Sequence, residues 1–310
     1  MPIVALAAAG AGLASALLHG ALLSGSFGAI ILAYLAQLPL FLIGLWMGYT
    51  SAAIAVVTGV VALVAAGGFV FALAYLLVNA APALIMTFLA QHNRIGSDGQ
   101  TEWYPPGMLI TALVGIAAAM FLSLFAIYLD SPGGAEGLLR RGLETAFRQL
   151  GAPGAAGNAD ASATAAVMAQ FMPGVVAASW MAMVIINGVL AQGLLVRFGR
   201  NLRPSPRMAD IDLPPWLLGA VAIALAGAFM PGNAHFLGAN LFLIFMPAYV
   251  LAGLGVVHAL AARLASRGLL LTATYALALL LGWPLVIAAL LGLAEPWLNL
   301  RRRFGGGAGT

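Results

Sequence analysis

The chain has 310 residues, of which 63% are hydrophobic and only 7% are charged. A soluble domain carries roughly 25% charged residues, so a chain this apolar must have lipid as the solvent for most of its surface. The net charge of +4 does not indicate nucleic-acid binding, because the arginines fall in separate short loops instead of on one face. Cysteine is absent, which excludes disulfides and cysteine-based metal sites.

Apolar segments dominate the chain, and a spanning helix needs about 20 mostly apolar residues. The segments predicted to span the membrane are 4–23, 28–48, 51–66, 69–90, 107–129, 166–196, 214–231, 238–262 and 268–292. The third segment is short and meets the fourth at Gly67-Gly68. We therefore predict an all-α fold, a single integral membrane domain over 1–310. It would be a polytopic bundle of about eight or nine spanning helices, several of them kinked or broken at prolines.

The orientation of the bundle is predicted from its basic loops. The N-terminal segment has no basic residue before its apolar run, so we expect it to remain as a first span and not to be cleaved as a signal peptide. The loop 197–207 carries four arginines, which predicts a cytoplasmic location. Counting helices backwards places 130–165 outside and the N-terminus in the cytoplasm. These features predict a multi-pass protein of a bacterial inner membrane.

The C-terminal apolar stretch conflicts with a simple count of spans. Arg263 and Arg267 precede 268–300, and Arg301-Arg302-Arg303 follows it, so a single span would place the two basic groups on opposite sides. Gly282-Trp283-Pro284 lies at its middle, and a proline there breaks or kinks a helix. A short hairpin broken at this point is preferred, and a single ninth span that violates the charge rule is the alternative.

Three segments are predicted to lie outside the spans. The segment 134–150 has apolar residues at helical spacing and predicts an extracytoplasmic amphipathic helix on the outer membrane surface. The alternative is a lid over an outward-facing cavity. The stretch 151–165 is predicted to be a flexible linker from its composition, and 301–310 a basic, glycine-rich cytoplasmic tail.

Motifs for catalysis are absent from the sequence. No carboxylate lies in the middle of a predicted span, which argues against a proton-driven pump. The patterns HExxH and GxSxG and a phosphate-binding glycine-rich loop do not occur. The histidines form no pair at helical spacing, so no metal site is indicated. We expect no enzymatic activity and no cofactor.

Neutral polar side chains within or at the ends of the spans are the candidate ligand-binding residues. Such groups must find partners in hydrocarbon, and several precede a proline that frees a carbonyl one turn earlier. Broken helices that carry amides can line a ligand cavity near mid-membrane, whereas the alternative is interhelical hydrogen bonds that only hold the bundle together. The candidates for a cavity are Asn79, Gln170, Asn187, Gln192, Asn240 and His258.

A stripe of small residues follows the first span. Ala8, Gly12, Ala16 and Gly20 recur every four residues, a spacing that allows two helices to approach closely. The stripe predicts a helix-packing or partner-docking face. Whether the partner helix belongs to this chain or to another stays open.

Two stretches near the C-terminus support a family resemblance. The first runs from Asn240 through Tyr249 and His258 to Arg263, and the second is the ending from Leu291 through Glu295 and Trp297 to Arg303. A weaker third stretch is 79–94, with Pro82. In these stretches the chain resembles the YybS-like bacterial membrane proteins (domain-of-unknown-function family 2232). It departs from them at Asn299, where the family often has an acidic residue, and in its long segment 130–165.

The resemblance implies a further similarity, to the substrate-binding membrane subunits of energy-coupling-factor transporters. Those subunits bind vitamins or related small molecules and dock on partner transporter subunits through small residues of their first helix. The stripe that contains Gly12 fits that pattern. Because fold does not fix function, these properties are expectations for this chain.

Two functions are therefore predicted. The first is a small-molecule binding or transport subunit that contacts membrane lipids, a small hydrophobic or vitamin-like ligand, and partner transporter subunits with an ATPase. The second is a non-transporting scaffold for assembly or envelope maintenance. A cavity lined by the candidate amides favours the first function, and a solid core with those amides bonded to backbone favours the second.

Overall fold

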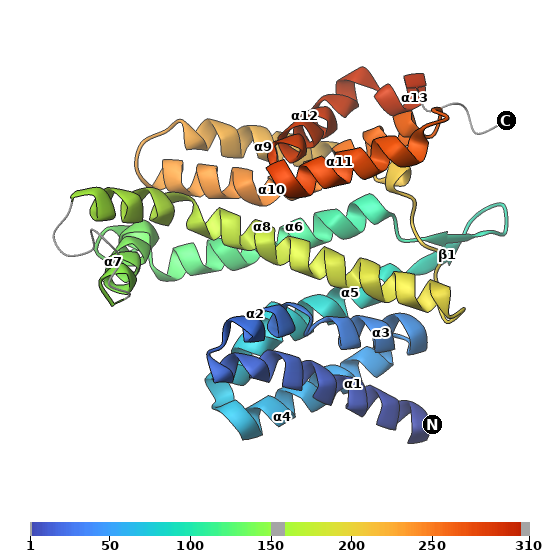
Figure 1. The fold of residues 1–310 in the computed structure, drawn as a ribbon, viewed down its shortest axis with the longest axis horizontal. Coiled ribbons are helices and arrows are strands. Elements are labelled where there is room, and N and C mark those ends of the chain that lie inside the picture. The colour runs from blue at the N-terminus through green and yellow to red at the C-terminus, as the bar shows by residue number, and fades with distance from the viewer. Residues whose placement is uncertain (1, 150–158, 305–310) are drawn as a thin grey trace. The chain divides into compact units, whose positions relative to one another are not determined.

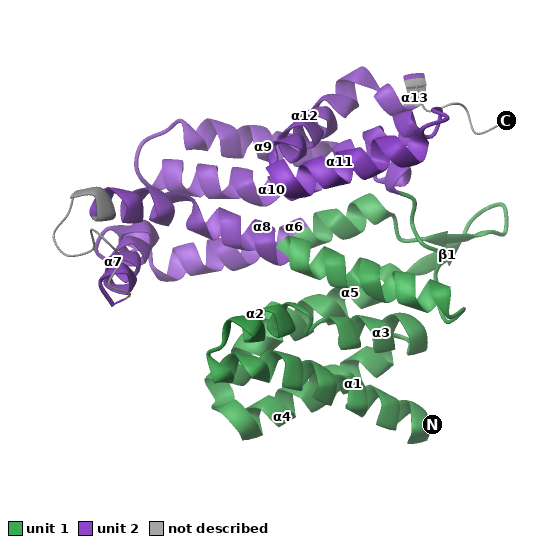
Figure 2. Ribbon diagram, in the orientation of Figure 1, with its two compact units in different colours: residues 1–113, 181–207 green, residues 114–180, 208–310 purple. Residues whose placement is uncertain are grey.

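The computed structural model describes residues 2–149 and 159–304, whose regular secondary structure is helical apart from one short β-hairpin (Figure 1). The predicted all-α class is therefore confirmed. The chain divides into two compact units (Figure 2). Unit 1 consists of Met1–Leu113 and Met181–Arg207, and unit 2 of Val114–Trp180 and Met208–Thr310.

Unit 1 contains the N-terminal elements, the start of α6 and the end of α8. They are α1 (Pro2–Gly20), the 3₁₀ turn η1 (Ala21–Ser24), α2 (Phe27–Tyr34), α3 (Leu38–Met47), α4 (Tyr49–Tyr75), the π-helical turn η2 (Leu76–Ala80), α5 (Ala81–Gln91), β1 (Asn93–Ile95), β2 (Thr101–Trp103), α6 (Pro106–Ile127) and α8 (Ala159–Arg197). The two strands are antiparallel, with Asn93 opposite Trp103 and Ile95 opposite Thr101.

Unit 2 contains the rest of α6 and α8 and the C-terminal elements. They are α7 (Gly134–Gln149), the 3₁₀ turn η3 (Met208–Asp210), α9 (Pro215–Ala228), α10 (Asn233–Ala261), α11 (Arg267–Leu281), α12 (Trp283–Leu298) and the short α13 (Leu300–Phe304). Proline opens α9, where its fixed φ suits the first helical turn.

Fewer helices are long and apolar enough to cross a membrane than the sequence predicts. Within residues 2–149 and 159–304, six helices are long and apolar enough to span, or up to seven if a bent pair counts as one span. The six are Pro2–Ser24, Phe27–Met47, Tyr49–Gln91, Pro106–Ile127, Ser162–Arg197 and Asn233–Ala261. The difference arises because Tyr49–Gln91 counts as one segment and α9 has only 14 residues.

The long segment Tyr49–Gln91 is interrupted where the sequence predicts a boundary between two spans. Gly68 has φ 83° and ψ 173°, which is not helical, and a positive φ of this kind favours glycine. The two halves then pack together, because a Cβ added to Gly59 would lie 2.7 Å from the Tyr75 hydroxyl oxygen. The segment therefore folds back at Gly68.

The predicted break at Gly282-Trp283-Pro284 is also confirmed. Gly282 has φ 72° and ends α11, and Pro284 lies in the first turn of α12. The two helices are bent by 118° at this point. The helices α11 and α12 therefore form a hairpin-like pair in place of one continuous helix. The basic residues before α11 and after α12 predict such a break.

The predictions for the middle of the chain are partly correct. The amphipathic helix α7 forms, with a 3.0 Å ion pair between Arg140 Nε and Glu144 Oε1. Residues 151–158 of the predicted linker lie outside the described part of the chain. From Ala159 onwards the chain is helical, so the linker prediction is wrong for 159–165. This stretch is rich in alanine, which has the highest helix propensity.

The small-residue stripe of α1 packs against α4 of the same chain. Ala8, Gly12 and Ala16 are buried, and a Cβ added to Gly12 would lie 2.2 Å from the Ala55 carbonyl oxygen. Beyond them, a Cβ added to Gly20 would lie 3.7 Å from a side-chain carbon of Leu63, on the same helix. The helix that meets this stripe therefore belongs to this chain, and a docking role towards a second protein stays a prediction.

This packing predicts a strong response at Gly12. A Gly12→Leu substitution would drive a side chain into the α4 backbone, and we expect it to lower stability by about 2 kcal/mol or more, as overpacking of a tight contact does. The measurement is the thermal unfolding midpoint in detergent. Gly10→Leu is the matched control, because a Cβ at Gly10 meets nothing within 4 Å. Equal midpoints for the two variants would contradict the close approach of α1 and α4.

Candidate functional site

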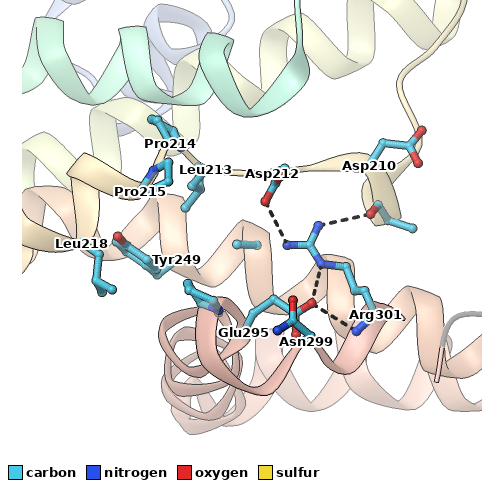
Figure 3. A pocket seen from close by; sticks show the side chains of 14 residues that line it. Asp210, Asp212, Leu213, Pro214, Pro215, Leu218, Tyr249, Glu295, Asn299 and Arg301 are labelled. Carbon is cyan, nitrogen blue, oxygen red and sulfur yellow. Dashed lines mark hydrogen bonds and ion pairs between the residues drawn. The ribbon is translucent and has the colours of Figure 1, made fainter. Parts of the chain in front are cut away.

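A pocket of about 550 Å³ lies in unit 2, and its walls come from α10, α12, α13, the start of α9 and the segment from η3 to α9 (Figure 3). This volume is in the range of small-molecule sites. The apolar part of the wall consists of Leu213, Pro214, Pro215, Leu218, Tyr249 and Ala252. Four charged residues also line it, namely Asp210, Asp212, Glu295 and Arg301.

A close helix crossing positions two walls of the pocket. A Cβ added to Gly253 of α10 would lie 1.7 Å from the Ala288 carbonyl oxygen of α12. A Cβ added to Gly292 would lie 2.1 Å from the Tyr249 carbonyl oxygen. The missing side chains allow the two backbones to touch. The crossing therefore brings Tyr249 beside the turn of α12 that precedes Glu295.

Glu295 and Arg301 form a buried ion pair at the end of α12. The exposed fractions of their side chains are 10% and 16%, and Arg301 Nε donates to Glu295 Oε1 at 3.2 Å. The same carboxylate accepts hydrogen bonds from the backbone N–H groups of Leu300 and Arg301, at 2.9 and 3.1 Å. Glu295 therefore holds both the turn from α12 into α13 and the guanidinium of Arg301 in place.

Arg301 also fixes the segment that forms the opposite wall. Its Nη1 donates to the carbonyl oxygens of Ala209 and Ile211, at 3.2 and 2.5 Å. Its Nη2 lies 3.8 Å from Asp212 Oδ1, whose side chain is 92% exposed (Figure 3). An exposed ion pair at this distance adds little stability. The carbonyl contacts therefore join η3 to the end of α12 more firmly than the contact with Asp212 does.

Acidic side chains outnumber basic ones among the residues that line the pocket. The carboxylates of Asp212 and Glu295 both lie within ion-pair distance of the Arg301 guanidinium, and Asp210 lines the pocket as well. The donors of Arg301 are already directed at Glu295 and at backbone carbonyls, so few remain for an anion. A molecule with an apolar body and a cationic group suits this combination of walls.

The family model DUF2232, described as a predicted membrane protein, matches residues 13–295. The chain belongs to the DUF2232 family. No curated protein and no solved structure matches it. The DUF2232 match includes Tyr249 and Glu295, which line the pocket and lie in the two stretches that carry the resemblance at the sequence level.

The candidate residues predicted from the DUF2232 sequence lie away from this pocket. Asn79, Asn187 and Gln192 belong to unit 1, and Gln170, Asn240 and His258 to unit 2. None of the six lines the pocket. The sequence points to polar groups inside the spans, whereas the charged groups of the pocket lie around η3, near the end of α12 and in α13, beside the middle of α10. Their ligand-binding role stays a prediction.

In unit 2, Asn240 repairs a helix that a proline interrupts. Pro173 lies inside α8, and Gly174 N donates to Asn240 Oδ1 at 2.7 Å. Asn240 Nδ2 donates to the carbonyl oxygens of Gln170 and Phe236, both at 2.8 Å. The amide of Asn240 thus bridges the Gly174 N–H and the Gln170 carbonyl oxygen, one residue beyond the helical bond that Pro173 itself cannot make. Gln170 is also in contact with His235 through their side-chain nitrogens.

In unit 1, Asn79 and Asn187 each keep one unpaired oxygen. Asn79 Nδ2 lies 3.2 Å from His19 Nδ1, and Asn187 Nδ2 donates to the carbonyl oxygens of Tyr34 and Met183, at 2.7 and 2.8 Å. Within the described residues, Asn79 Oδ1, Asn187 Oδ1 and His19 Nε2 have no hydrogen-bond partner. The two free amide oxygens can accept hydrogen bonds, and His19 Nε2 can donate one when Nδ1 accepts from Asn79.

The last two candidates make local contacts. Gln192 Nε2 donates to the Arg203 carbonyl oxygen at 2.7 Å and fixes the loop after α8. His258 Nδ1 lies 3.0 Å from the Leu254 carbonyl oxygen one turn earlier, and its ring packs edge-on against Tyr275. Both side chains hold their own segments of this DUF2232 protein, and a ligand-binding role for them stays a prediction.

Proposed function

We propose that this membrane protein is a small-molecule binding subunit whose ligand occupies the pocket beside Glu295 and Arg301. The observation that supports this function is the cavity of about 550 Å³ with an apolar wall and an acidic end. A fixed ion pair and a close helix crossing support the site before any ligand binds, and preorganisation of this kind favours affinity. The ligand class that fits is a small amphipathic molecule with a cationic group.

Such a subunit would take its energy from partner subunits with an ATPase, because its sequence has no nucleotide-binding motif of its own. We expect no chemical step on this chain. The arginines of 301–303 support a cytoplasmic location for the end of unit 2 that carries the pocket. The arginines of 197–207 support a bacterial inner membrane location with the N-terminus in the cytoplasm.

Filling the pocket tests this function. Leu218 on α9 lines the cavity, so Leu218→Trp should occupy part of the space and abolish binding. We expect native mass spectrometry of the protein, released gently from its own membrane, to show a reproducible small-molecule adduct on the wild type and at least a ten-fold lower occupancy on the variant. Ile223→Trp is the control, because Ile223 is 76% exposed on the same helix and does not line the pocket. Equal adduct occupancy on Leu218→Trp and Ile223→Trp would exclude this site. So would the absence of an adduct on the wild type.

A scaffold is the second candidate function, and one observation favours it. The amides of Asn187 and Asn240 donate to backbone carbonyls and join helices, as expected for residues that hold a bundle together. A scaffold predicts that the wild type leaves the membrane without a small-molecule adduct and with a non-transport protein bound. The same mass spectra therefore distinguish the two functions.

A further inference from the structure

Unit 1 has a basic surface at the end of α8 that the proposed pocket does not use. The segment 197–207 contains Arg197, Arg200, Arg203 and Arg207. Among the described residues, the first three form no ion pair with a carboxylate, whereas Arg94 in the same unit is paired with Glu102 at 2.6 Å. Positive charge in this segment is therefore left without an acidic partner from the protein.

Arg203 supplies a positive charge that is buried. Only 7% of the residue is exposed, and its guanidinium donates to the carbonyl oxygens of Ala90 and Tyr104, at 3.0 and 2.8 Å. The guanidinium also lies 6.0 Å from the ring of Trp103. Burial lowers the pKa of Arg203, but a guanidinium remains charged in proteins. The positive charge of Arg203 is therefore balanced by carbonyl dipoles and an aromatic ring, and not by a carboxylate.

Arg200 presents a second guanidinium at the surface. It lies 4.8 Å above the ring of Trp46, at the end of α3, and stacking of this kind holds the cation in place. Two large apolar side chains flank it and are exposed, Phe198 by 70% and Leu202 by 53%. Alternation of arginine with exposed apolar residues and tryptophan is typical of the boundary between headgroups and acyl chains.

We propose that the segment 197–203, together with Trp46, binds the phosphate of an anionic phospholipid. Arg200 would contact the phosphate, Arg203 would add its field from below, and Phe198 and Leu202 would enter the acyl region. Anionic lipids attract arginines beside cytoplasmic helix ends, and a guanidinium matches the geometry of a phosphate. The exposed apolar side chains of Phe198 and Leu202 favour a lipid over a free anion, because a soluble phosphate ion has no apolar part to contact them.

Lipid titration of the purified, delipidated full chain tests this site. We expect native mass spectrometry to show tighter binding of phosphatidylglycerol than of phosphatidylcholine, and Arg200→Gln to reduce the phosphatidylglycerol affinity about five-fold. Arg94→Gln changes the net charge equally but removes an arginine that Glu102 already neutralises, so it should bind as the wild type does. Both variants change exposed side chains and should keep the wild-type unfolding midpoint.

Two further experiments distinguish a lipid phosphate from a soluble phosphate ion. Phe198→Ser should weaken phosphatidylglycerol binding without any change in competition by inorganic phosphate. Equal binding of the two lipids, or equal losses in Arg200→Gln and Arg94→Gln, would overturn the site. Full displacement of the lipid by inorganic phosphate at millimolar concentration would identify a soluble anion site and overturn the lipid assignment. These outcomes are independent of the pocket in unit 2.

Discussion

Replacing Gly253 with leucine is expected to force α10 and α12 apart and to destabilise the protein by about 3 kcal/mol, the upper end of the usual cost of overpacking. A Cβ at this position would lie 1.7 Å from the Ala288 carbonyl oxygen. The clashing atom belongs to a helix backbone, so it cannot rotate away as a side chain could. Thermal unfolding in detergent, followed by tryptophan fluorescence, measures the effect.

The same substitution should also damage the pocket. Ala252 and Tyr249 lie on one side of the crossing and Gly292 on the other, and all three line the cavity. Ligand occupancy should therefore fall together with the unfolding midpoint. Gly219→Leu is the matched control, because a Cβ at Gly219 of α9 meets nothing within 4 Å. A Gly253→Leu protein as stable as this control would refute the close crossing.

Removing the Arg301 guanidinium is expected to cost roughly 3 kcal/mol, the lower end of the range for breaking one side of a buried ion pair. Arg301→Leu leaves the Glu295 carboxylate, 10% exposed, with only two backbone N–H groups. It also leaves the carbonyl oxygens of Ala209 and Ile211 without their donor. Arg301→Lys should lie between the wild type and the leucine variant, because an ammonium group cannot fork between these acceptors.

The double variant makes this prediction specific. When Glu295→Leu is combined with Arg301→Leu, neither charge of this pair remains, so the losses of the two single variants should sum to clearly more than the loss in the double variant. Arg303→Leu is the control, because Arg303 is exposed on the same short helix. Strict additivity of the unfolding free energies would show that Glu295 and Arg301 do not interact.

The sequence predicts the positions of the helices more accurately than it predicts the number of membrane-spanning segments. Long apolar runs mark them, and glycine and proline mark the breaks at Gly68 and Gly282, where the backbone leaves the helical region. The number of spans differs because composition shows that a segment is apolar but not how long its helix is. Alanine-rich residues 159–165 show the opposite error, since helix propensity there outweighs a linker-like composition.

The pocket was much harder to predict because it combines residues distant in sequence. Arg301 meets the carbonyl oxygens of Ala209 and Ile211 only after the chain has folded, and no local pattern indicates that contact. The proline at 173 does indicate that a helical bond must be replaced. It does not indicate that Asn240 would replace it. Sequence pattern thus identifies a need for a partner, and the tertiary fold selects the partner.

The bend at Gly282 has a consequence for how the end of the chain is inserted into the membrane. With 15 and 16 residues, α11 and α12 each measure roughly 22 to 24 Å, less than the hydrocarbon thickness of about 30 Å. No charged residue occurs between Arg267 and Glu295. Neither helix alone is long enough to cross, and the bend between them carries no charged residue. A pair of this kind that enters and returns on one side of a membrane inserts without any polar loop being translocated.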